Sequence, residues 1–144
     1  MHPLRCLLLL SFLLIPCSVA FAQTDDTKPD PIDTIVKKMM DKDPSTPGMQ
    51  DAIQHGTDLW DAQMNIVYGQ LMKKLPANER TDLQKSQRAW LAYRDAQTEL
   101  VGTIYAHAEG TEFRSTSANE LLNLVKTRTL LLRAYLVILE ENSQ

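Results

Sequence analysis

The chain of 144 residues has little cysteine, little glycine and no excess of basic charge. Its two cysteines, Cys6 and Cys17, both lie in the first 22 residues, so the remainder has neither a disulfide nor a cysteine metal site. None of the five glycines forms a phosphate-binding loop. With 15 basic and 18 acidic residues, the chain is not expected to bind nucleic acid. The residues that are present, 44% hydrophobic and 23% charged, are typical of one globular domain.

The first 22 residues have the pattern of a cleaved secretory signal peptide. Arg5 precedes an almost unbroken apolar run at 6–15, and Ala20 and Ala22 stand where signal peptidase needs small residues. The run is about half as long as the ~20 residues that a membrane-spanning helix needs, so we expect no stable membrane anchor. We therefore expect cleavage near Ala22 and a periplasmic or secreted protein.

Cys17 raises one alternative, because a cysteine after an apolar stretch can be lipidated. Pro16 is a poor residue directly before a lipidated cysteine, and a good cleavage site follows, so we favour cleavage. Removal of the signal peptide also removes one basic residue, Arg5, which leaves 14 basic against 18 acidic residues and a net charge of −4.

Residues 23–45 are a polar segment with one short predicted helix. Asp30 is the expected N-cap, Pro31 suits the first helical position, and Asp43 before Pro44 ends the pattern. The apolar residues between them follow helical spacing: Ile32, Ile35, Val36, Met39 and Met40.

Residues 46–140 predict an all-α domain built around a long antiparallel hairpin. The first helix of the hairpin begins at Thr46, as the cap, and Pro47, and it ends before Pro76. The second helix runs over about 78–107, and the short turn between the two requires them to lie antiparallel. The core stripe expected on the first helix is Met49, Ala52, Ile53, Gly56, Trp60, Met64, Val67, Leu71 and Leu75. The stripe expected on the second is Leu83, Trp90, Tyr93, Ala96, Leu100 and Ile104.

The last predicted helix follows a loop at 108–116. Ser117 and Glu120 have the spacing of a capping box, and the helix continues to about Glu140. Residues 121–139 are apolar on nearly every side. This indicates a helix that packs on the hairpin at the centre of a small bundle, or one that a partner covers, such as a second copy of the chain.

No pattern in the sequence predicts catalysis. The chain has no serine in a strained nucleophile turn, and no cysteine nucleophile remains after the signal peptide. Asp51, His55 and Asp58 recur at helical spacing and would suit a divalent cation, but charged residues on an outer helix face are usually solvated. We expect no enzyme, no metal site and no cofactor; the competing hypothesis is a small metal-dependent enzyme of the cell envelope.

The most distinctive segment is 87–95, Gln-Arg-Ala-Trp-Leu-Ala-Tyr-Arg-Asp. Trp90 and Tyr93 share one helix face, and Arg94 follows Trp90 by one turn. Aromatic and arginine side chains together are typical of binding hot spots. In the structural alternative, which we favour, Trp90 fills the hairpin core, the Tyr93 hydroxyl stays in water and Arg94 binds a carboxylate or a helix C-terminus.

The segment 87–95 resembles the signature of the LprI-like family, small exported bacterial proteins named for a lysozyme-inhibiting lipoprotein. Residues 46–49 are similar to the family's Thr-x-x-Met opening, and 64–71 to its Leu-Asn-x-x-Tyr-x-x-Leu segment. Arg128 resembles the arginine of a late Thr-x-x-Arg element, so the resemblance covers about 46–132. We expect four residues of this signature to be mainly structural: Gln87, Trp90, Tyr93 and Arg94.

One departure from the family pattern is the loss of its cysteines. Ala52 and Thr98 stand where relatives usually carry cysteine, and 117–119 has none near the start of the last helix. Packing must therefore replace cross-links that are typically worth about 2–5 kcal/mol in a small secreted domain.

The resemblance implies a binding protein, with occlusion of the cleft of a lysozyme-type glycosidase as the first hypothesis. Lysozymes of the common type are basic, and a negatively charged domain would be steered towards them. The alternative is a structural or assembly module of the cell envelope that forms a homodimer through 121–139. The side chains expected to contact a protein partner are Arg88, Asp95, Asp58 and Asp61.

Overall fold

The computed structural model describes residues 28–107 and 112–142. Within them the chain forms four helices and no strand, which confirms the all-α prediction. The predicted signal peptide and the centre of the last loop lie outside the described residues. Inside these ranges, no helix combines the length and apolar character that a membrane crossing requires. The helices are α1 (Pro31–Lys42), α2 (Thr46–Lys74), α3 (Ala77–Tyr105) and α4 (Glu112–Glu141).

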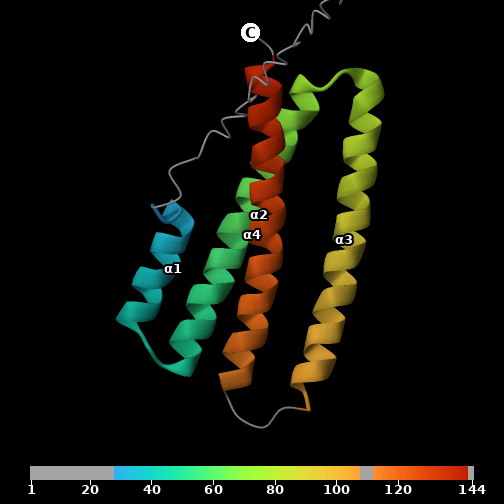
Figure 1. Ribbon diagram of the computed structural model, residues 1–144. Coiled ribbons are helices and arrows are strands. Elements are labelled where there is room, and N and C mark those ends of the chain that lie inside the picture. Colours follow the sequence, from blue (N-terminus) through green and yellow to red (C-terminus); the bar gives the residue numbers. More distant parts are fainter. Residues whose placement is uncertain (1–27, 108–111, 143–144) are drawn as a thin grey trace, which may run out of the picture.

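Helices α2 and α4 run parallel at the centre of the bundle, with α1 on one side and α3 on the other (Figure 1). The tight turn before α3 makes α2 and α3 antiparallel, as predicted. The backbones of α2 and α4 nevertheless make the closest approach, and α3 stands further off. The central contact therefore joins two helices that are far apart in the sequence.

The start of α2 differs by one residue from the prediction. Ser45, not Thr46, is the N-cap: its backbone is extended, at φ −66° and ψ 157°, and its hydroxyl accepts a hydrogen bond from the Gly48 N–H at 3.2 Å. Thr46 is already helical. At α1 the predicted cap is confirmed, because the Asp30 carboxylate accepts from the Ile32 N–H at 2.9 Å.

Helix α4 begins at Glu112, earlier than the capping box predicted. Ser117 lies inside the helix, and the Glu120 carboxylate accepts a hydrogen bond from the Tyr105 hydroxyl at the end of α3. This hydrogen bond raises the pKa of Tyr105. Phe113 packs on the same tyrosine, with ring centroids 6.2 Å apart. The prediction of a start at Ser117 is wrong because these contacts with α3 hold an additional turn in helical form.

The apolar stripe predicted on α2 supplies most of the core. Trp60, Met64, Val67 and Leu71 are each at most 2% exposed. Gly56 lets α2 approach both neighbours, because a Cβ there would meet Val36 Cγ2 at 2.4 Å and Leu122 Cδ1 at 2.9 Å. The buried residues of α4 that face this stripe are Leu122, Val125, Thr129 and Leu132.

Two ion pairs hold α1 against α4. Asp33 pairs with Lys126 at 2.6 Å, and Asp30 pairs with Arg133 at 2.7 Å. Both cations also lie over the ring of Trp60, with Lys126 Nζ at 5.6 Å and Arg133 Cζ at 5.1 Å from its centroid. The buried tryptophan is thus covered by charges that α1 neutralises.

The stripe predicted on α3 is mostly wrong. Tyr93, Leu100 and Ile104 are 54%, 51% and 58% exposed, whereas Gln87 and Val101 are buried. The helix is rotated so that a largely polar face points at the bundle. The reason lies in α4, which presents a buried arginine to this face and needs hydrogen-bond acceptors opposite it.

Candidate functional site

The buried arginine is Arg128, which is 8% exposed. Its Nε and Nη2 donate to Gln87 Oε1 at 3.1 and 3.0 Å, and Nη2 also donates to Ser86 Oγ at 3.1 Å. Gln87 in turn places its amide nitrogen 3.6 Å from Met64 Sδ on α2. One glutamine of the signature thereby connects α3 to both central helices, which explains why a polar residue occupies this core position.

Trp90 lies one turn further along α3, between two guanidinium groups. Arg94 Cζ is 5.6 Å and Arg128 Cζ 5.9 Å from its ring centroid. The indole also packs against both halves of the core, the one around Trp60 and the one around Met64. Its position holds the signature segment of α3 at a fixed rotation against α2 and α4.

Arg94 places its guanidinium group at the edge of the bundle, where it contacts two surface carboxylates. It donates to Asp95 Oδ1 through Nε at 3.0 Å and Nη2 at 2.8 Å, and its Nη1 lies 3.9 Å from Asp61 Oδ1 on α2. The side chains of Asp61 and Asp95 are 42% and 65% exposed. One cation therefore stands between two carboxylates that remain open to solvent, which leaves a local excess of negative charge.

Asp61 and Arg94 line a groove between α2 and α3. The groove has a volume of about 550 Å³ and includes Asp61, Arg88 and Arg94 in its lining. A smaller hollow of about 310 Å³ shares Asp61 and Arg94 with it and adds Asp58. The structure thus brings three of the expected partner-binding residues to one surface, with Asp95 attached to it through Arg94. We call this surface, made of Asp58, Asp61, Arg88, Arg94 and Asp95, the α2–α3 face.

Of the three residues of the metal hypothesis, only Asp58 belongs to the α2–α3 face. Asp51 and His55 are exposed, and the Asp58 carboxylate accepts a hydrogen bond from Gln54 Nε2 at 2.9 Å. In the part of the chain that the structure describes, no three histidine, cysteine or acidic side chains are placed to hold a metal ion.

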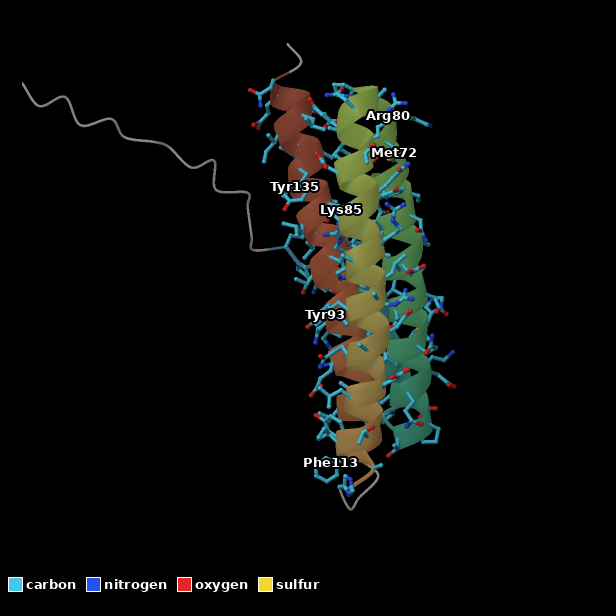
Figure 2. All side chains as sticks on the ribbon, turned by 90° about the vertical axis from the view of Figure 1, so that its right-hand side faces the viewer. Met72, Arg80, Lys85, Tyr93, Phe113 and Tyr135 are labelled. Atoms are coloured by element: carbon cyan, nitrogen blue, oxygen red, sulfur yellow. The ribbon has the colours of Figure 1, made fainter. Side chains whose placement is uncertain are left out.

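A second groove, between α3 and α4, did not follow from the sequence analysis. It has a volume of about 480 Å³ and is lined mainly by apolar side chains, with Arg128 among them. Tyr93, labelled in Figure 2, lines this groove, whereas Tyr135, further along α4, lines another hollow. A signal for the groove was present, because Arg128 is one of few charged residues in the otherwise apolar stretch 121–139.

Comparisons with known proteins support the family resemblance and the fold. A family model described as "Lysozyme inhibitor LprI" matches residues 37–132, which include every residue that lines the two grooves. A search of curated proteins found no match. The crystal structure of an uncharacterised protein from Burkholderia thailandensis is similar, with a TM-score of 0.74 and 30% sequence identity over 80% of this chain and 58% of that chain. The present chain therefore spans little more than half the length of that protein.

Proposed function

The chain belongs to the LprI lysozyme inhibitor family, and on that premise we propose that it is an exported protein that binds and inhibits a lysozyme-type glycosidase. The observation that carries this proposal is the family match over 37–132, because that range supplies every residue of the α2–α3 face. Export would follow cleavage near Ala22, leaving the polar segment 23–45 and the helical domain 46–140. The family description names an inhibitor, so we propose no catalytic role.

The α2–α3 face is the surface that we propose enters the glycosidase cleft. Its exposed carboxylates, Asp58, Asp61 and Asp95, complement a basic enzyme. The face is also held rigidly, because Arg94 joins two of these acids and Trp90 fixes the helix beneath. A preorganised surface loses less entropy on binding.

Titration calorimetry of residues 23–144 against a basic c-type lysozyme tests this function, with a cell-wall lysis assay alongside. We expect binding that weakens from low to physiological salt, because rim charges act through screened attraction. We also expect lysis to slow in proportion to the complex formed. Absence of both heat and inhibition at low salt would overturn the proposal.

Exposed apolar residues on α4 favour a second candidate, self-association. Leu131, Tyr135, Val137 and Ile138 are 42%, 45%, 50% and 53% exposed, more than a solitary helix bundle needs to leave uncovered. In that case the chain would be an assembly module of the envelope. We expect Leu131→Glu with Ile138→Glu to convert a dimer to monomer in light scattering; a dimer of unchanged mass would exclude this interface.

A further inference from the structure

The α3–α4 groove lies on the other flank of α3 from the α2–α3 face and shares none of that face's charged side chains. Its volume of about 480 Å³ is that of a small-molecule site. Apolar side chains from both helices form most of its walls, among them Val101 on α3 and Leu121, Leu124 and Leu131 on α4. The lining also includes Glu120, whose carboxylate accepts a hydrogen bond from the Tyr105 hydroxyl and forms no ion pair with Arg128. A groove of this shape and lining suits an alkyl chain that lies along the helices.

The same groove contains a buried cation without a counter-ion. Arg94 and Arg133 each lie within 4.0 Å of a carboxylate, but in the described part of the chain no ion pair includes Arg128. Its hydrogen bonds to Gln87 and Ser86 are to neutral groups and leave Nη1 without an acceptor among the described residues. A buried charge of this kind is costly unless an opposite charge reaches it.

The pKa of Arg128 also indicates that its positive charge is disfavoured in this groove. Burial lowers the pKa of Arg128, so the surroundings oppose its positive charge. Trp90, at 5.9 Å, stabilises the cation only from its flat face. Nε and Nη2 already donate to Gln87 and Ser86, so Nη1 is the nitrogen that can donate a charge-assisted hydrogen bond to the carboxylate of a ligand.

We propose that the α3–α4 groove binds an amphiphile that carries one carboxylate, such as a free fatty acid, with the carboxylate on Arg128 and the alkyl chain on Val101, Leu121 and Leu124. A cationic or uncharged headgroup leaves the arginine without its counter-ion. A carboxylate at the end of a flexible chain reaches a buried guanidinium, whereas one on the surface of a folded partner is held too far out by its own backbone. This site does not depend on the proposed inhibition of lysozyme.

Decanoate is the probe that tests the site, added to the full chain purified after export. The side chains of the two tryptophans give separate indole N–H signals in NMR, and only Trp90 lines the groove. We expect decanoate to shift the Trp90 signal with little effect on Trp60, and decyltrimethylammonium, which has the same chain and the opposite charge, to shift neither. Equal shifts from both amphiphiles would overturn the role of Arg128.

Two neighbouring leucines of α4 provide a matched pair of variants. Leu130 and Leu131 are both 42% exposed, but only Leu131 lines the groove. We expect Leu131→Asp to weaken decanoate binding at least about tenfold, through like-charge repulsion and lost apolar contact, and Leu130→Asp to leave it unchanged. Equal effects of the two variants would place the probe elsewhere.

Arg128→Lys tests the headgroup contact itself. Lysine keeps the charge, but one amino group cannot replace both the nitrogens that bind Gln87 and Ser86 and the Nη1 donor, so we expect decanoate affinity to fall about tenfold while the chain stays folded. If the variant does not fold, the comparison of Leu131→Asp with Leu130→Asp still tests the site. A chain that binds no decanoate but forms dimers that Leu131→Asp dissociates would overturn the proposal in favour of a second copy as the occupant.

Discussion

Two glycines of α2 differ in how closely the neighbouring helices pack against them. A Cβ at Gly56 would lie 2.4 Å from Val36 Cγ2 and 2.9 Å from Leu122 Cδ1, whereas a Cβ at Gly69 would meet nothing within 4 Å. Gly56 therefore sets the distance at which α1 and α4 pack on α2. Gly69 has no such role and only weakens the helix.

We expect opposite changes in the free energy of unfolding when each glycine is replaced by alanine. Gly56→Ala should destabilise the chain by about 1–3 kcal/mol, because the new methyl group overpacks the contact. Gly69→Ala should stabilise it by up to about 1 kcal/mol, because alanine is the better helix former. Urea unfolding of both variants measures the difference; a gain of stability in Gly56→Ala would contradict the packing described for α1 and α4.

At the scale of the helices, the corner between α1 and α2 contains an acidic residue, Asp43, which is the C-cap of α1. The Ser45 hydroxyl and then its backbone N–H, the latter at 3.1 Å, donate hydrogen bonds to the Asp43 carboxylate and lower the pKa of Asp43 from its ordinary value of 3.8. Because the folded pKa is below the unfolded one, the carboxylate stabilises the corner above pH 3.8 and ceases to do so as the pH falls through the folded pKa.

Comparison of the original chain with the Asp43→Asn variant tests the direction of this dependence of stability on pH. We expect the original chain to be the more stable near neutral pH, and the difference in unfolding free energy to shrink below pH 3.8 as Asp43 is protonated. Urea unfolding from pH 7 to pH 2 gives the difference, and NMR titration of the Asp43 carboxyl gives the pKa. A difference that grows towards acid pH would contradict the account.

The helices also show where sequence patterns succeed and where they fail. The stripe from Ala52 to Leu71 predicted the buried face of α2 correctly, because every large residue on it is apolar. The same reasoning placed Tyr93 and Leu100 in the core, and both are exposed. It failed because Arg128 on another helix requires Gln87 opposite it, and one helix's periodicity contains no information about its neighbour's polar groups.

At the scale of the whole molecule, the two flanks of α3 carry different chemistry. One flank joins α2 in a polar face with Asp61 and Asp95, and the other joins α4 in an apolar groove with Arg128. The sequence indicated the charged residues of the first, because Arg88, Arg94 and Asp95 stand in the signature and Asp58 and Asp61 lie on the other helix of the predicted hairpin. Of the second it indicated only Arg128, because the groove forms between the facing sides of α3 and α4 and depends on how these two helices pack.

A charged residue can strengthen a complex by direct contact within the interface or by long-range attraction that speeds association, and the α2–α3 face allows the two effects to be told apart. Any loss of negative charge weakens attraction to a basic enzyme, but only charges within the interface hold the complex together. Asp41 and Glu141 are exposed acids on α1 and at the end of α4, away from the face. They provide a control that changes the net charge by the same amount as replacement of Asp61 and Asp95.

The measurement that tests the central claim most directly is the inhibition constant for cell-wall lysis by a c-type lysozyme, for two double variants. For Asp61→Asn with Asp95→Asn we predict inhibition weakened about tenfold or more, as expected when charge-assisted contacts are lost. For Asp41→Asn with Glu141→Gln we predict a change of less than about threefold, mainly in the association rate. Equal constants for the two variants would contradict the claim that the α2–α3 face binds the enzyme.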